Sequence, residues 1–212
     1  MSEHPDGYLA TPVTGNGGAV LVLHAWWGLN DTFRGLCDRL ADAGYLAFAP
    51  DLYHGRVANT IDNAENLMRA LDDAQAGADL AAATDFLYER GGRRAAGLAV
   101  IGFSMGANYA LELAERDPAR VGRVVLFYGT GRDEFSRSRA AYQGHFAAKD
   151  EFEEQAYIDS VADGLRRAGC PVTFYTYPDT AHWFFEPDRP EYNAAAADLA
   201  WERTLAFLDE KH

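Results

Sequence analysis

Apolar residues follow two alternating patterns along the chain. Short uninterrupted apolar runs, such as Ala-Val-Leu-Val-Leu at 19–23, are typical of strands buried on both faces of a parallel sheet. Between these runs apolar residues recur every three or four positions, as in amphipathic helices. The runs, with a β-branched and aromatic segment near the C-terminus, predict strands at 19–23, 45–49, 98–102, 121–128 and 172–177, and a weaker strand at 140–147.

Helices are predicted from the apolar spacing and from residues that begin or end helices. Gly44 follows the segment 32–43 as a C-terminal cap. The last helix is predicted to begin near Pro190, because Asp188 precedes Glu191 by three residues, as in a capping box. The predicted helices are 32–43, 61–71, 79–90, 104–116, 154–168 and a last one with Trp201, Leu205 and Leu208 on one side.

The alternation of strands and helices defines the expected fold class. It predicts an α/β protein with a doubly wound, mostly parallel sheet and helices on both faces. No Pro/Ser-rich linker or shift in composition divides the 212 residues, so we expect residues 1–212 to form a single domain. In such sheets ligands bind beyond the carboxyl ends of the strands, which is where candidate chemistry should lie.

Composition and charge limit the classes of partner that the protein is expected to bind. The chain is 48% apolar and 24% charged, as in a globular protein, and its net charge of −13 argues against nucleic acid and anionic membranes. No basic segment followed by an apolar run begins the chain, and no run is long enough to span a bilayer, so we expect a cytoplasmic protein. Cys37 and Cys170 each predict a buried thiol and not a disulfide pair.

A candidate nucleophile lies where the strand at 98–102 meets the following helix. Gly102-Phe103-Ser104-Met105-Gly106 is a Gly-x-Ser-x-Gly sequence between an apolar strand and a helix. Such a turn presents the serine hydroxyl at the top of the sheet, and its glycines let strand and helix pass closely. The alternative is a glycine-rich strand-to-helix connection without chemistry. A carboxylate and a histidine that follow Ser104 in that order would favour the catalytic interpretation.

His182 is the candidate general base. It lies five residues after the last predicted strand and before the C-terminal helix, the position expected after a nucleophile and an acid. His145 is the other internal histidine downstream of Ser104. The remaining histidines are terminal, precede the nucleophile or abut a strand: His4, His24, His54 and His212.

The candidate acid is Asp150, which follows the weak strand and precedes a helix. The alternatives are Asp133, Asp179 and the neighbouring Glu151. The acidic segment around Asp150 is also compatible with a solvated helix start, where carboxylates interact favourably with the helix dipole.

An oxyanion site and an aromatic pocket complete the predicted site. Acyl transfer needs two backbone N–H groups directed at the developing oxyanion, and the candidates are those of Met105, after the nucleophile, and Trp26, in the loop after the first predicted strand. Aromatic residues near these loops are candidates to bind a small uncharged ester or lactone: Trp26, Trp27, Tyr53, Phe103, Trp183 and Phe184.

Several segments, in order, resemble the dienelactone hydrolase family of α/β-hydrolases. They are HAWWGLN, GYLAFAPDLYHGR, GFSMGA, GHFAAKDEF, YPDTAHWFF and RPEYNAAAADLAWERTLAFL. The resemblance implies an α/β-hydrolase fold with a minimal core and no large lid domain, and no cofactor or metal. Residue by residue it implies a nucleophile at Ser104, an acid at Asp150, a base at His182 and oxyanion amides at Trp26 and Met105.

Three positions depart from the pattern of this family. Ser104 stands where the namesake enzymes have cysteine, and Ala25 stands where the cysteine enzymes have glutamate, so we expect a plain serine mechanism. Glu186 stands where resembling enzymes use arginine to bind a substrate carboxylate. Dienelactone itself is therefore not the expected substrate, although Arg69 or Arg189 is left open as a partner for a carboxylate.

The predicted function is a serine hydrolase that cleaves a small carboxylic ester or lactone through an acyl-enzyme. Two alternatives stay open: a thioesterase or acyl transferase that uses the same residues, and a protein of this fold that binds a small ligand or partner without turnover. The expected partner is a small-molecule substrate, with no nucleic acid and no membrane, and the oligomeric state is left open.

Overall fold

The computed structural model describes residues 4–14, 18–92, 97–131 and 134–210, and its seven strands form one sheet. The elements are β1 (Gly7–Ala10), β2 (Ala19–Leu23), α1 (Asp31–Asp42), β3 (Leu46–Pro50), α2 (Ile61–Arg69), α3 (Asp73–Leu87), a π-helical turn (Tyr88–Gly92), β4 (Leu98–Phe103), α4 (Met105–Arg116), β5 (Val121–Phe127), β6 (Ala141–Ala147), α5 (Gln155–Arg167), β7 (Val172–Tyr177) and α6 (Ala194–Asp209).

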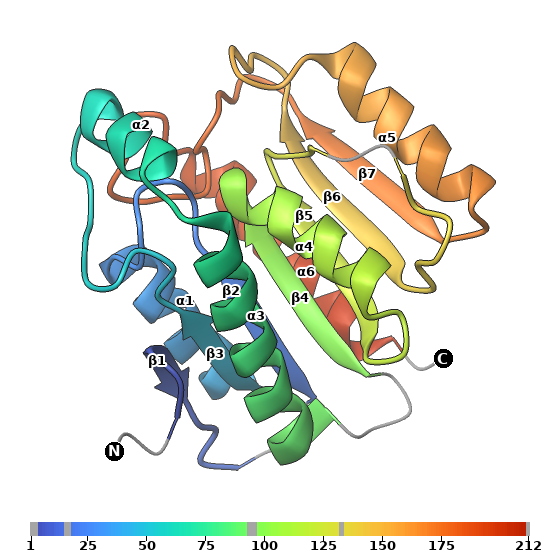
Figure 1. Cartoon of the computed structure of the whole chain (residues 1–212). Helices are drawn as coiled ribbons and strands as arrows, with labels where there is room; N and C mark the ends of the chain where they lie inside the picture. The colour runs from blue at the N-terminus through green and yellow to red at the C-terminus, as the bar shows by residue number, and fades with distance from the viewer. Residues whose placement is uncertain (1–3, 15–17, 93–96, 132–133, 211–212) are drawn as a thin grey trace.

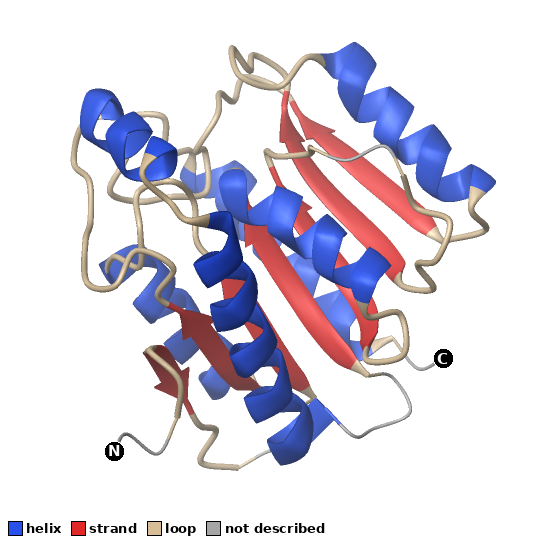
Figure 2. Cartoon of the chain, in the orientation of Figure 1, coloured by secondary structure: helices blue, strands red, loops and turns tan. Residues whose placement is uncertain are grey.

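The strand order across the sheet is β1-β3-β2-β4-β5-β6-β7, and every pair is parallel except β1 with β3. The helices α3, α4 and α5 cover one face, and α1 and α6 cover the other (Figures 1 and 2). The expected doubly wound, mostly parallel α/β sheet is therefore confirmed, and with it the α/β-hydrolase fold.

Alternation along each strand divides the core into two layers. In β2, Val20 and Val22 pack into the layer under α1 and α6, whereas Ala19, Leu21 and Leu23 pack into the layer under α3, α4 and α5. All five side chains are buried. An uninterrupted apolar run is needed here because successive side chains point to opposite faces and both faces are covered.

Strand β1 has no counterpart in the sequence prediction. It is four residues long, pairs antiparallel with β3 at the edge of the sheet, and buries only its last residue, Ala10. An edge strand this short and half-exposed lacks the continuous apolar run that marks the central strands, so the pattern alone does not predict it.

The predicted start of the last helix is wrong. Helix α6 begins at Ala194, where the side chain of Asn193 accepts a hydrogen bond from the backbone N–H of Ala196 (3.1 Å). The carboxylate of Asp188, predicted as part of a capping box near Pro190, instead accepts a hydrogen bond from the Thr32 hydroxyl (2.8 Å). A tertiary contact to the start of α1 therefore replaces the local cap.

Helix α3 begins earlier than predicted, at Asp73 and not at 79. The carboxylate of Asp72 caps it by accepting hydrogen bonds from the N–H groups of Ala74 and Gln75. Its first two turns are rich in alanine and carry little apolar periodicity, which is why spacing alone placed the start too late.

Candidate active site

Ser104 lies in a strained turn between β4 and α4. Its backbone has φ 49° and ψ −113°, a region that non-glycine residues rarely adopt, and its N–H donates to the carbonyl of Phe127 (2.9 Å). A Cβ atom at Gly102 would collide with the backbone of Gly106, and one at Gly106 would collide with the carbonyl of Leu23. The Gly-x-Ser-x-Gly sequence is therefore required for the close passage of β4 and α4.

The hydroxyl of Ser104 is directed at His182. Ser104 makes no side-chain cap for α4, and its Oγ lies 3.0 Å from Nε2 of His182. His182 lies in the loop after β7 and is 4% exposed, with its ring packed between those of Tyr128 and Phe152. Trp183 follows with φ 64°, another strained residue. The loop is thus shaped to hold the imidazole in one position.

Asp150 occupies the other side of the imidazole. Its two carboxylate oxygens lie 2.9 and 2.8 Å from Nδ1 of His182, and its side chain is 2% exposed. One of these oxygens also accepts hydrogen bonds from the backbone N–H groups of Phe152 (2.9 Å) and Glu153 (3.1 Å). The carboxylate is therefore fixed toward the ring, and Ser104, His182 and Asp150 form one continuous chain of hydrogen bonds.

The alternative acids lie elsewhere. Asp179 forms an exposed ion pair with Lys149 (2.8 Å), and Glu151 is exposed to solvent. Asp133 lies outside the described residues. Among the described acids, Asp150 is the one hydrogen-bonded to His182.

The alternative histidines have other partners. His145 is fully buried in β6, and burial lowers its pKa to about 3. His24 is also fully buried, and its Nε2 accepts from the backbone N–H of Leu52 (3.3 Å). The ring of His4 packs against Phe48 and Phe86, His54 pairs with Asp6 and Asp79, and His212 lies outside the described residues.

Trp26 and Met105 lie at the same cleft as Ser104. Trp26 is in the turn after β2, which the hydrogen bond from Gly28 N–H to the Ala25 carbonyl (3.1 Å) closes, and Met105 is the first residue of α4. Both residues line the cleft, which has a volume of about 480 Å³. The fold therefore brings both predicted oxyanion residues to the candidate nucleophile.

The predicted aromatic pocket residues lie mostly in the core. Trp26 lines the cleft, but five others do not, and each is at most 5% exposed: Trp27, Tyr53, Phe103, Trp183 and Phe184. They pack against neighbouring rings, as where Phe103 stacks on Phe127 with a centroid distance of 4.5 Å and Trp27 contacts Trp183 at 5.2 Å. These buried rings support the loops that carry the site.

The residues that line the cleft were mostly not singled out by sequence. They are Trp26, Met68, Leu71, Asp73, Ser104, Met105, Asn108, Tyr109, Phe152 and Glu153. Met68 and Leu71 belong to the apolar pattern of the α2 region, which by itself indicates packing. Met68 is in fact 41% exposed, because it borders the cleft, whereas Ala64 of the same helix is buried in the core. Helix α2 lies at the carboxyl edge of the sheet (Figure 1).

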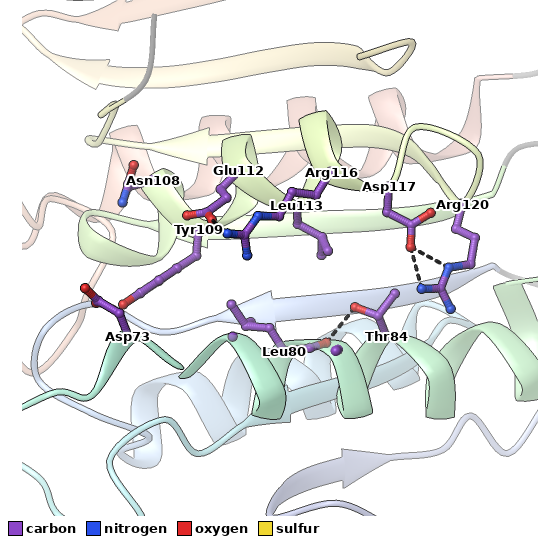
Figure 3. A pocket seen from close by; sticks show the side chains of 12 residues that line it. Asp73, Leu80, Thr84, Asn108, Tyr109, Glu112, Leu113, Arg116, Asp117 and Arg120 are labelled. Atoms are coloured by element: carbon purple, nitrogen blue, oxygen red, sulfur yellow. Dashed lines mark hydrogen bonds and ion pairs between the residues drawn. The ribbon is translucent and has the colours of Figure 1, made fainter. Parts of the chain in front are cut away.

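A second cavity of about 490 Å³ lies between α3 and α4 (Figure 3) and adjoins the cleft, since Asp73, Asn108 and Tyr109 line both. Its arginines are paired: Arg116 with Glu112 at 2.8 Å, and Arg120 with Asp117 at 2.5 Å. The hydroxyl group of Thr84, which also lines the cavity, donates to the backbone carbonyl of Leu80 in the same helix. None of the described residues that line this cavity is a Ser, Cys or His, so none of them forms a nucleophile paired with a histidine.

Glu186 does not line the cleft. It is fully buried, and one carboxylate oxygen accepts a hydrogen bond from the Tyr128 hydroxyl (2.8 Å), while the other has no partner among the described residues. Burial raises the pKa of Glu186 to about 8. The ring of Tyr128 lies 5.0 Å from that of His182, so Glu186 belongs to the packing behind the imidazole.

The structure also bears on membranes, metals and disulfides. No helix in the described ranges combines the length and apolarity that crossing a bilayer requires. Within the same ranges, no three or more His, Cys, Asp or Glu side chains are grouped so that they could hold a metal ion. Cys37 and Cys170 are buried free thiols.

Comparison with known proteins decides the family. The model of the dienelactone hydrolase family matches residues 6–212. The chain belongs to this family. Membership makes it a dienelactone hydrolase-like carboxylic ester hydrolase.

Relatives and solved structures agree with this assignment. An Aquifex aeolicus protein that is named as a carboxymethylenebutenolidase is 30% identical to this chain, over 95% of this chain and 91% of its own length. A Bradyrhizobium protein that is named as a 2-oxo-3-(5-oxofuran-2-ylidene)propanoate lactonase is 31% identical to this chain, over 95% of this chain and 87% of its own length. A Klebsiella pneumoniae crystal structure assigned as a dienelactone hydrolase has a TM-score of 0.84 at 28% identity, covering 97% of this chain and 92% of that one.

Proposed function

We propose that this hydrolase cleaves a small carboxylic ester or lactone through an acyl-enzyme on Ser104, with His182 as general base and Asp150 as the acid that orients it. The observation that carries the proposal is the hydrogen-bond chain from Ser104 Oγ, which lines the cleft, through the His182 ring to Asp150. A serine hydroxyl is a weak nucleophile until an adjacent base accepts its proton.

In the acylation step, Ser104 Oγ attacks the carbonyl carbon of the substrate while its proton passes to Nε2 of His182. Asp150 then stabilises the imidazolium through Nδ1–H. The carbonyl oxygen becomes an oxyanion, which the backbone N–H groups of Trp26 and Met105 stabilise. When the intermediate collapses, the bond to the alcohol oxygen breaks, and His182 returns its proton to that oxygen.

In the deacylation step, water takes the position of the alcohol. His182 accepts a proton from the water as the water oxygen attacks the acyl carbon. When this intermediate collapses, the bond to Ser104 Oγ breaks, His182 returns its proton to Oγ, and a carboxylic acid is released. With a lactone as substrate the alcohol stays attached to the acyl group, so the product is one hydroxy acid.

The strained backbone of Ser104 supports this assignment. A residue held at φ 49° costs free energy, of the order of 1–3 kcal/mol, which the surrounding structure must supply. A connection without chemistry would avoid this cost, whereas a nucleophile turn uses it to direct the hydroxyl at the imidazole. The strain is thus expected of a working site.

Labelling with a fluorophosphonate tests the proposal, because the reagent phosphonylates a serine activated by a base. We expect one adduct per chain, located on Ser104 by mass spectrometry, and none on Ser104→Ala. The exposed Ser136 supplies a matched control, since Ser136→Ala should label like the wild type. An unlabelled wild-type protein would contradict the mechanism and favour a binding protein without turnover. Aryl-ester hydrolysis that Ser104→Ala leaves intact would contradict Ser104 as the nucleophile.

A panel of oxygen esters and thioesters with one acyl group, measured beside a set of lactones, separates hydrolysis of oxygen esters from thioesterase activity. The same three side chains serve all these substrates, and the leaving group alone distinguishes them. We expect the oxygen esters and lactones to give the higher kcat/KM.

A further inference from the structure

The rim of the cleft beside Ser104 exposes apolar side chains. Met68 in α2 is 41% exposed, and Phe152 after β6 is 50% exposed. Trp26, Leu71 and Met105 line the cleft with them. Covering apolar surface with an apolar group gains about 25 cal/mol per Å². The cleft therefore favours a substrate whose acyl or alcohol part is a hydrocarbon.

The charged side chains of the cleft are all acidic. Asp73 and Glu153 are its two carboxylates, and none of its ten described lining residues is Lys, Arg or His. Glu153 is held in place by Thr130, whose backbone N–H donates to one carboxylate oxygen (3.1 Å) and whose hydroxyl donates to the other (2.6 Å). Asp73 is the first residue of α3 and is exposed at the rim.

The two arginines left open as partners for a substrate carboxylate are engaged elsewhere. Arg69 pairs with Glu65 one helical turn away in α2 (2.6 Å). Arg189 pairs with Asp188 (2.6 Å), and its guanidinium lies 4.1 Å from the ring centre of the buried Trp27. Neither lines the cleft, so neither offers a positive charge to a substrate there.

Resting on the ester hydrolase function proposed above, we infer that the cleft selects esters with apolar, uncharged acyl and alcohol groups, and that Asp73 and Glu153 exclude esters that carry a carboxylate near the scissile bond. The repulsion between two like charges about 6 Å apart, in a medium with an effective dielectric constant of about 40, lowers a binding or rate constant about tenfold. Two such carboxylates together should discriminate by more than tenfold. Added salt weakens the exclusion, because the rim is open to solvent.

The test uses two 4-nitrophenyl esters of glutaric acid that differ only at the distal carboxyl, which is a methyl ester in one and free in the other. At pH 8 and low ionic strength we expect kcat/KM to be at least about 30-fold higher for the methyl ester. The double variant Asp73→Asn/Glu153→Gln should lower this ratio by more than about tenfold. Raising the ionic strength should also lower the ratio of the two kcat/KM values for the wild type, which checks the inference without any substitution.

Glu151→Gln is the matched control. It changes the net charge of the chain as Glu153→Gln does, but Glu151 is exposed and does not line the cleft. It should keep the wild-type ratio. Equal kcat/KM for the two esters in the wild type, or a ratio that the double variant leaves unchanged, would overturn the inference.

Binding to the Ser104→Ala protein separates this inference from the proposed function. Tryptophan fluorescence, to which Trp26 in the cleft contributes, can follow titration with dimethyl glutarate and with monomethyl glutarate. If the wild type hydrolyses neither nitrophenyl ester, the hydrolase mechanism fails, and the binding preference still decides selectivity. Tighter binding of dimethyl glutarate than of monomethyl glutarate supports the inferred selectivity, and equal binding overturns it.

Discussion

The two internal histidines that follow Ser104 differ in their neighbours more than in their burial. His145 is fully buried in β6, between the Tyr177 hydroxyl on Nδ1 (2.8 Å) and the Gln143 side chain on Nε2 (3.0 Å). His182 is almost as buried, but its nitrogens face the Asp150 carboxylate and the Ser104 hydroxyl. Burial alone penalises a charged imidazole, and an adjacent carboxylate compensates for it.

This comparison separates structural from chemical histidines. His145, among neutral partners, has its pKa lowered to about 3 by burial and stays neutral at physiological pH. A general base must accept a proton during each turnover, so it needs a partner that stabilises the imidazolium and a donor within reach. His182 has both, whereas the side chains hydrogen-bonded to His145 in the described structure are Tyr177, Gln143 and Thr204, none of which is a carboxylate.

The largest expected effect is that of removing the imidazole of His182. His182→Ala should lower kcat/KM for a small aryl ester by about 10⁴-fold or more, because Ser104 then has no base. Steady-state kinetics measures the loss, and circular dichroism shows whether the fold is kept. Activity above a tenth of the wild type would break the distinction between the two histidines.

Replacing Asp150 should have the next largest effect. Asp150→Asn should lower kcat/KM by about 10³-fold, because an amide cannot stabilise the imidazolium or hold the required tautomer. Asp179→Asn is the matched control, since Asp179 forms an exposed ion pair with Lys149 (2.8 Å) and should change kcat/KM by less than about threefold. Similar losses in both variants would contradict the assignment of the acid.

Glu186 extends the comparison to a second buried carboxyl group near His182. Its pKa is raised by burial from 4.5 to about 8. Between these pH values the folded carboxyl keeps its proton while the unfolded one loses it, so wild-type stability falls as the pH rises through this window. Below the window both states are protonated and the effect vanishes.

Glu186→Gln removes this titration and keeps an acceptor for the Tyr128 hydroxyl. We expect the variant to gain stability relative to the wild type as the pH rises, by about 5 kcal/mol at pH 9, with no such gain at pH 4. Urea unfolding at both pH values measures the difference, and the exposed Glu151→Gln should show no comparable trend. A pH-independent difference would mean that Glu186 is ionised throughout in the folded chain.

The smallest effect on activity is expected at His145. His145→Gln should leave kcat/KM within about threefold of the wild type, while the free energy of unfolding falls by about 1–2 kcal/mol through lost hydrogen bonds and ring packing. Chemical denaturation and steady-state kinetics together measure both changes. A large loss of kcat with unchanged stability would give His145 a role in the reaction that its neutral partners do not indicate.

The sequence by itself determined the layered α/β architecture and the order of the candidate chemistry. The apolar runs at β2 and β4 are continuous because both faces of a parallel sheet are covered, so each strand carries its own signal. The turn at Ser104 is equally local, because the close passage of strand and helix demands glycine at Gly102 and Gly106. Chain order then pointed to His182 as the histidine after the last strand.

Only the tertiary structure decided which side chains meet. Ser104 and His182 are 78 positions apart, and Asp150 and His182 are 32 apart, so their hydrogen bonds depend on how the loops after β4, β6 and β7 converge. The same convergence placed Trp27 and Phe103 in the core and left Met68 exposed at the cleft. An apolar side chain has the same sequence signal in either place, because that signal reports hydrophobicity and not the neighbour that covers it.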